Sequence, residues 1–184
     1  MEIKSRYYCF TLLLGLFTLE LNALPEMIIG ESTMEPGINL IFEGGIKDEV
    51  QPGKFYLDEN NTDVHLEVLA NWSNNAPLGS PEKGHVAYLD ISAVVTNEQT
   101  NKSLMVKLTP HLNLSDNLHY AQNIRLPGAV DQTYTVLFKI NQPKPGNLGM
   151  HYDWRKQVSN SLTAGGIFEF KNLSFKEIAL SSRR

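Results

Sequence analysis

The sequence predicts an all-β sandwich built as a single domain. Short runs of alternating or β-branched residues are separated by Gly, Pro and Asn turn signals, and no long window shows helical periodicity. The chain after its N-terminal segment, about 160 residues, is long enough for one domain with a full-sized core. Several short strands in a domain of this size are typical of two packed antiparallel sheets.

The expected strands follow from the local pattern. The first covers residues 38–42 and ends before the pair Gly44-Gly45. Residues 64–72 alternate most clearly, so that successive side chains face opposite sides of the sheet. The turn at 97–101 joins two strong strands into a hairpin. The other expected strands are 86–96, 103–109, 133–140 and 167–175, with a weaker run near 123–126.

The N-terminal segment is predicted to be a secretory signal peptide. Lys4 and Arg6 precede an apolar run at 7–19, and a small residue follows at a suitable cleavage position. The run is too short to span a membrane as a helix. We therefore expect a cleaved peptide at 1–23 and one mature domain at 24–184, with an uncleaved N-terminal anchor as the alternative.

Composition excludes several kinds of site. Cys9, the one cysteine, lies inside the predicted signal peptide, so the mature chain has no thiolate for a metal, a disulfide or a nucleophile. The net charge is −4 and the basic residues are scattered, which argues against a nucleic-acid partner. Motifs of hydrolases and phosphate-binding loops are missing from the sequence. Any metal must be held by nitrogen, oxygen or thioether ligands.

His65 and Glu67 are the first candidate ligands. They stand two residues apart in the alternating run, so both side chains project from one face of the strand. The neighbours on that face, Leu69 and Asn71, are less polar than a solvated surface requires. A His–Glu pair on a covered face can supply two ligands of a metal site, whereas on an open surface it is an ordinary solvated pair.

The second group of candidates is His111 and His119, which lie on either side of a turn-like centre. If the chain folds back there, both imidazoles can point inward, with Asp116 close enough to orient one ring as an outer hydrogen-bonding partner. The alternative is a polar connecting loop whose histidines are solvated.

The long irregular stretch at 143–166 carries His151 and Asp153. Loops of this length in a compact domain are commonly functional. We expect His151 as a further ligand and Asp153 as an outer partner, or else both as exposed loop residues. Met34 and Glu35 are possible additional ligands, although core or surface roles also suit them.

Six short stretches are distributed along most of the mature chain: 34–40 (MEPGINL), 63–67 (DVHLE), 79–82 (GSPE), 88–91 (YLDI), 119–124 (HYAQNI) and 149–153 (GMHYD). In these stretches the chain resembles the periplasmic iron-transport proteins that bind copper and iron. That family accompanies an iron permease of the inner membrane and includes a treponemal periplasmic metal-binding lipoprotein. The resemblance implies an immunoglobulin-like β-sandwich, a homodimer, and a metal site at His65, Glu67, His119 and His151.

The chain departs from the family pattern in two places. The family usually has a methionine shortly before its second-motif histidine, and His111 stands at the best-matching position. Replacing a thioether by an imidazole hardens the site and favours Cu(II), Fe(II) or Zn(II) over Cu(I). The chain also has an insertion between Leu40 and Asp63, which can change the dimer contact or the approach to the site.

The sequence therefore predicts a periplasmic metal-binding protein that assists high-affinity iron uptake. It would bind a copper or iron ion, or another divalent cation, through a histidine-rich site. Because imidazole must be neutral to bind a metal, binding should weaken below roughly pH 6. The alternatives are a copper-dependent iron redox enzyme and a secreted, adhesion-type sandwich with no metal.

Overall fold

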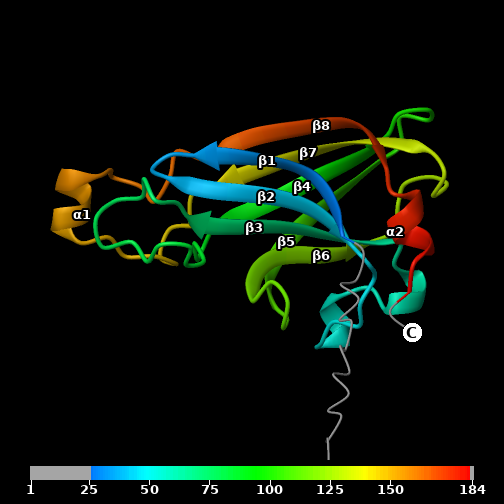
Figure 1. Cartoon of the computed structure of the whole chain (residues 1–184), viewed down its shortest axis with the longest axis horizontal. Helices are drawn as coiled ribbons and strands as arrows, with labels where there is room; N and C mark the ends of the chain where they lie inside the picture. The colour runs from blue at the N-terminus through cyan, green and yellow to red at the C-terminus, as the bar shows by residue number, and fades with distance from the viewer. Residues whose placement is uncertain (1–25, 183–184) are drawn as a thin grey trace, which may run out of the picture.

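A computed structural model describes residues 26–182, and every structural statement below concerns this part of the chain (Figure 1). The predicted signal peptide at 1–23 lies outside the described residues. None of the described helices has the length and apolar character needed to cross a bilayer.

Eight antiparallel strands form the fold, in the order β1-β2-β3-β6-β5-β4-β7-β8. β5 belongs to both halves of the sheet, because residues 103–108 pair with β4 and residues 109–112 pair with β6. The edge strands β1 and β8 also contact each other, so the sheet folds over on itself as a sandwich. The strands are β1 (Met27–Met34), β2 (Ile38–Gly45), β3 (Val64–Trp72), β4 (Asp90–Asn97), β5 (Ser103–Leu112), β6 (Leu118–Ile124), β7 (Thr133–Asn141) and β8 (Gly166–Ser174).

The core lies between the two halves of the sheet, where aromatic side chains meet. The ring of Phe42 on β2 is fully buried, and its centroid lies 4.6 Å from that of Phe138 on β7. Phe168 and Phe170 on β8 stand 5.2 and 5.1 Å from the same ring. These contacts join one half of the sheet to the other and confirm the all-β sandwich predicted from the sequence.

The helical segments are short and lie in connections. Two 3-10 turns, Gly53–Phe55 and Glu59–Asn61, stand in the connection between β2 and β3, and the helices are α1 (Tyr152–Gln157) and α2 (Lys176–Leu180). Figure 1 shows α1 at one end of the molecule, and the β2–β3 connection and α2 toward the other end. This separation matters for the site described below.

Most strand predictions are confirmed, and the differences have local causes. The strand at 64–72 has the predicted bounds, and the turn at 97–101 joins β4 to β5. The predicted strand at 86–96 begins only at Asp90, because Tyr88 takes a positive φ of 69° that a strand cannot contain. The sequence pattern does not predict β1, since a glycine and polar residues interrupt its apolar residues. β6 was expected only near its end, because its polar residues face a buried site.

Candidate metal site

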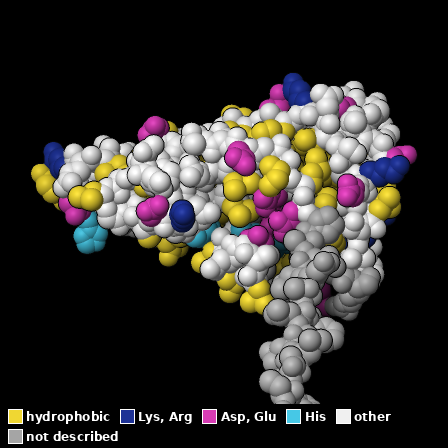
Figure 2. Space-filling view, in the orientation of Figure 1, with side chains coloured by type: hydrophobic (Ala, Val, Ile, Leu, Met, Phe, Trp, Pro, Cys, Tyr) yellow, Lys and Arg dark blue, Asp and Glu magenta, His cyan; other side chains and the backbone are white. Residues whose placement is uncertain are grey.

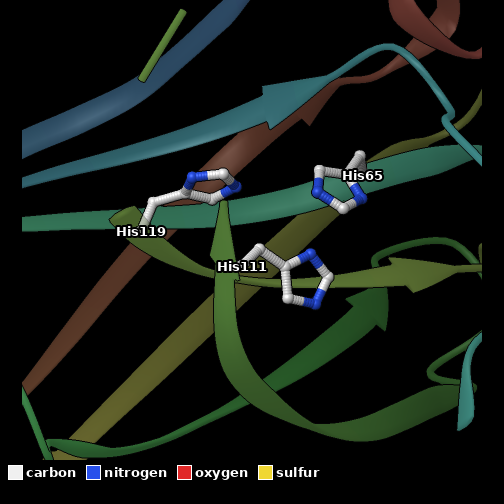
Figure 3. A group of neighbouring side chains, drawn as sticks. All are labelled: His65, His111 and His119. Carbon is white, nitrogen blue, oxygen red and sulfur yellow. The ribbon is translucent and has the colours of Figure 1, made fainter. Parts of the chain in front are cut away.

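Three histidines from three neighbouring strands meet in the interior. His65 comes from β3, His111 from β5 and His119 from β6 (Figure 3). His111 and His119 are direct partners in the β5–β6 ladder, and β6 pairs with β3. All three are buried, with 4%, 8% and 1% of their surface exposed. One ring nitrogen from each lies within 4.8 Å of the others, the spacing of a group that can hold a metal ion.

A buried asparagine forms a hydrogen bond with the ring of His65. Asn123 pairs with His65 across the β3–β6 ladder, and its Oδ1 lies 2.6 Å from Nδ1 of the imidazole. The amide nitrogen of Asn123 donates to two backbone carbonyls at 2.8 Å, those of Asp48 and Leu57. Because carbonyls only accept, the amide must place its oxygen toward His65. Nδ1 of His65 therefore carries the proton, and the lone pair of the ring lies on Nε2.

The backbone sets the tautomer of His119 in the same way. Its Nδ1 lies 3.1 Å from the carbonyl oxygen of Asn117, in the β5–β6 turn, so Nδ1 donates and Nε2 holds the lone pair. Nε2 of His119 is buried without a hydrogen-bond partner. A buried polar atom of this kind usually has a function or a missing partner.

Glu67 places a carboxylate beside both lone pairs. Its Oε1 lies 3.9 Å from Nε2 of His65, and its Oε2 lies 3.5 Å from Nε2 of His119. Two lone pairs and a carboxylate repel one another in a buried site unless a positive charge stands between them. The geometry therefore calls for a cation, either a proton or a metal ion. Figure 3 shows Nε2 of His65 and of His119 turned toward each other.

His111 completes the group from below the pair in Figure 3. Thr109 Oγ1 lies 3.2 Å from its Nε2, which leaves Nδ1 on the side of the other histidines. Burial, followed by the charges of His65 and His119, lowers the pKa of His111 to about 4. Burial also lowers the pKa of His119. Both rings therefore stay neutral down to a lower pH than a free imidazole does. Because a neutral ring can bind a metal, we expect metal binding to persist below the limit of roughly pH 6 inferred from the sequence.

Carboxylates surround one side of the histidine group. Asp116 forms a second possible metal-holding group with Glu67 and His119, again within 4.8 Å. Its Oδ2 accepts hydrogen bonds from Asn113 at 2.6 Å and from Ser115 at 2.7 Å, which hold it in the β5–β6 turn. Glu43, which pairs with Glu67 in the β2–β3 ladder, is also buried. Figure 2 shows Asp and Glu side chains gathered in the middle of this face, with histidine beside them.

The protonation of Glu43 provides a test of the close approach of these carboxylates. Burial, followed by the charges of Glu26, Asp116 and Glu31, raises the pKa of Glu43 to about 7. An unfolded glutamate titrates near 4.5, so Glu43 stabilises the fold below that pH and loses this contribution as the pH rises to 7. Glu43→Gln keeps the neutral shape at every pH. We therefore expect the variant to gain about 1–3 kcal/mol relative to wild type between pH 4.5 and 7, measured by urea unfolding of metal-free protein. A constant difference across that range would contradict the raised pKa.

The structure does not bring the remaining predicted residues to this group within one chain. His151 is exposed and is the residue just before α1, and Asp153 is exposed in the first turn of that helix. Met34 is buried at the last position of β1, where it pairs with Ile38 at the start of β2. Along β2, that point lies about 17 Å from the pairing of Glu43 with Glu67. Glu35 follows Met34, and its carbonyl accepts from Thr163 at 2.7 Å.

Sequence reasoning missed four residues that shape the site: Glu43, Tyr56, Thr109 and Asn123. Of these, only Asn123 could be predicted from the sequence. It stands four residues after His119 on the same strand, so both side chains lie on the same face of that strand. Tyr56 comes from the β2–β3 connection, and its ring packs edge-on against His111 with centroids 5.0 Å apart. A cavity of about 360 Å³ opens onto the three histidines, and the β2–β3 connection forms one of its walls.

The fold and the site together define an antiparallel β-sandwich with a buried group of three imidazoles and a carboxylate. The model of the Fe2+ transport protein family matches residues 23–176, and the chain belongs to this family.

Solved structures share the fold. A copper-bound variant of Campylobacter jejuni P19 is 24% identical, with a TM-score of 0.69 over 80% of this chain and 96% of that chain. FetP of uropathogenic Escherichia coli, as isolated, is 22% identical, with a TM-score of 0.69 over 82% of this chain and 96% of that chain. The comparison with curated proteins gives no significant match.

Proposed function

We propose that this chain is a periplasmic protein that binds a divalent copper or iron ion and assists iron uptake. The observation that carries the proposal is the pair of Nε2 lone pairs, on His65 and His119, held toward one buried carboxylate. A metal ion between these two nitrogens and the carboxylate of Glu67 would relieve the repulsion among them. It would also give Nε2 of His119, which has no hydrogen-bond partner, a bonding partner. Membership of the Fe2+ transport protein family supports the role in iron uptake.

The donor set indicates the class of metal. The candidate ligands are His65, Glu67, His111 and His119, which offer imidazole and carboxylate and no sulfur. Imidazole suits copper, iron and zinc, and a carboxylate adds preference for the harder divalent ions. The relatives of similar fold include copper-bound proteins, which supports copper as one occupant. We also propose that the protein then delivers the bound ion to an iron permease of the inner membrane.

Titration of the metal-free mature protein tests the binding. We would add Cu(II), Mn(II) and, without oxygen, Fe(II), and measure affinity and stoichiometry by calorimetry. The expected result is about one tightly bound ion per chain in the group of three histidines, with Cu(II) bound most tightly, as the general order of divalent affinities requires. Protein that retains none of the three metals after dialysis would contradict the proposal and would leave a sandwich without a metal role.

His151 enters the proposal through a second copy of the chain. It is exposed before α1 and does not join the histidine group of its own chain. If the protein is a homodimer, an exposed histidine at the end of one protomer can reach the site of its partner. We expect His151→Ala to lower metal affinity in the dimer, and mixed dimers to separate the two possibilities.

The mixed dimer combines one His151→Ala protomer with one His119→Ala protomer. If His151 acts on the partner, the His119→Ala chain keeps its intact His151 for the only functional histidine group, and that group binds as in wild type. If His151 acts within its own chain, both sites are impaired. Unchanged affinity in the His151→Ala homodimer would remove this residue from the ligand set.

A further inference from the structure

The connection between β2 and β3, residues 46–63, closes over the histidine group, and we call it the cover segment. Asp48, Glu49, Val50, Gln51 and Tyr56 line the cavity that opens onto the three histidines. Tyr56 packs against His111, and its hydroxyl lies 3.4 Å from Thr109 Oγ1, the atom that contacts His111 Nε2. The cover segment therefore touches the site on the side of β5.

The cover segment also reaches the site on the side of β3, through Asn123. Asn123 is 2% exposed, and its side-chain amide makes three contacts, one to His65 and two to the carbonyls of Asp48 and Leu57 in the cover segment. In the chain, Asp48 precedes the cover segment's 3-10 turn at 53–55 and Leu57 follows it. One side chain thus ties both limbs of the cover segment to a candidate metal ligand.

These contacts decide which nitrogen of His65 can bind a metal. An amide can turn by 180°, which exchanges its oxygen and its nitrogen. The carbonyls of Asp48 and Leu57 hold the nitrogen, so the oxygen stays toward His65. A turned amide would donate to Nδ1 and would move the ring proton to Nε2, the atom that faces Glu67. That tautomer cannot bind a metal at Nε2, because the lone pair there is lost.

We propose that Asn123 is a positioning residue through which the cover segment holds His65 in the tautomer that binds metal. The inference rests on the proposed function in one respect, since it takes Nε2 of His65 to be a ligand. It adds that the cover segment, besides covering the site, selects the proton position on a residue from another strand. Outer hydrogen-bond partners of metal-bound histidines have this effect, and losing them typically costs about 10–100-fold in affinity.

Two substitutions separate the halves of this link. Asn123→Leu removes both the contact to His65 and the contacts to the cover segment. Asn123→Asp keeps an oxygen that accepts from Nδ1 of His65, but it has no N–H to donate to the carbonyls of Asp48 and Leu57. Gln122→Ala is the matched control, because Gln122 is the neighbouring amide on the opposite face of β6.

The first measurement is the tautomer of His65 in metal-free protein, read from long-range nitrogen–proton NMR spectra of the imidazole. We expect a proton on Nδ1 in wild type, Gln122→Ala and Asn123→Asp, and a shift of the proton toward Nε2 in Asn123→Leu. Hydrogen exchange of residues 46–63 should be faster in both Asn123 variants than in the control. A proton that stays on Nδ1 in Asn123→Leu would overturn the proposal.

The second measurement is Cu(II) affinity. We expect a loss of about 10–100-fold in Asn123→Leu and a smaller loss in Asn123→Asp. Equal affinity in wild type and Asn123→Leu would overturn the positioning role even if the tautomer changed. If wild type itself binds no metal, the proposed function fails, while the NMR result still decides whether Asn123 sets the tautomer. Should Asn123→Leu not fold, Asn123→Asp tests the cover segment by hydrogen exchange: exchange as slow as in the control would overturn the link.

Discussion

Replacing both His65 and His119 with alanine is expected to abolish tight metal binding. The two imidazoles hold the Nε2 lone pairs that face Glu67, at 3.9 and 3.5 Å from its oxygens. Loss of one outer partner costs about 10–100-fold, so loss of two direct ligands should lower affinity by more than about 1,000-fold. The measurement is metal content after dialysis, combined with competition titration against a chelator of known affinity.

The matched control for this double variant is His85→Gln. His85 is a half-buried histidine whose ring packs against Tyr120 at 5.1 Å, and burial lowers its pKa, as it does for His119. It is not part of the histidine group. We expect the control to keep wild-type affinity. Thermal unfolding of all three proteins must show that each is folded, and metal retained by a folded double variant would place the binding site elsewhere.

Phe42→Ala is expected to have the largest effect on stability. Phe42 is fully buried, and its ring contacts three other phenylalanines that join the two halves of the sandwich. Truncation of a buried phenylalanine leaves a cavity and typically costs about 3–5 kcal/mol. In a domain of this size each kcal/mol lowers Tm by about 2–4 °C, so Tm should fall by about 6–20 °C.

Phe55→Ala serves as its control, because Phe55 is 65% exposed in the cover segment. Surface substitutions of this kind usually change stability by less than about 0.5 kcal/mol. Urea unfolding of both variants, without metal, gives the comparison. A similar loss in the two variants would show that the aromatic contacts of Phe42 do not hold the sandwich together.

The sequence predicted the strands whose pattern is local and missed those shaped by the site. The strand at 64–72 alternates between apolar and polar residues except at Leu69, and the structure gives it the same bounds. β6 was hidden because His119 and Asn123 look like loop residues, although both are buried. The alternation rule expects polar residues on the solvent side of a strand, and it fails where a polar group replaces the core.

The candidate site was predicted in part. Alternation placed His65 beside Glu67, and the turn between His111 and His119 is present, with the backbone N–H of Asn113 donating to the backbone carbonyl of Asn117. That β3 lies next to β6 is a property of strand order, which no local pattern contains. The contacts of Asn123 with Asp48 and Leu57 were also out of reach, because they join segments far apart in the chain.

The β5 strand, which pairs with β4 along its first part and with β6 along its last, gives the site a further property. His111 stands just past that change of partner, while His65 belongs to a strand on the other side of β6. The three rings meet only after β3 has docked against the β5–β6 hairpin, so an unfolded chain has no such pocket. An ion that binds there joins the three strands of the folded sandwich. At a free ion concentration one hundred times the dissociation constant, it adds about 2.7 kcal/mol to the free energy of unfolding. Loaded protein should therefore resist proteases longer than empty protein, and supply of the metal would set how long each molecule survives.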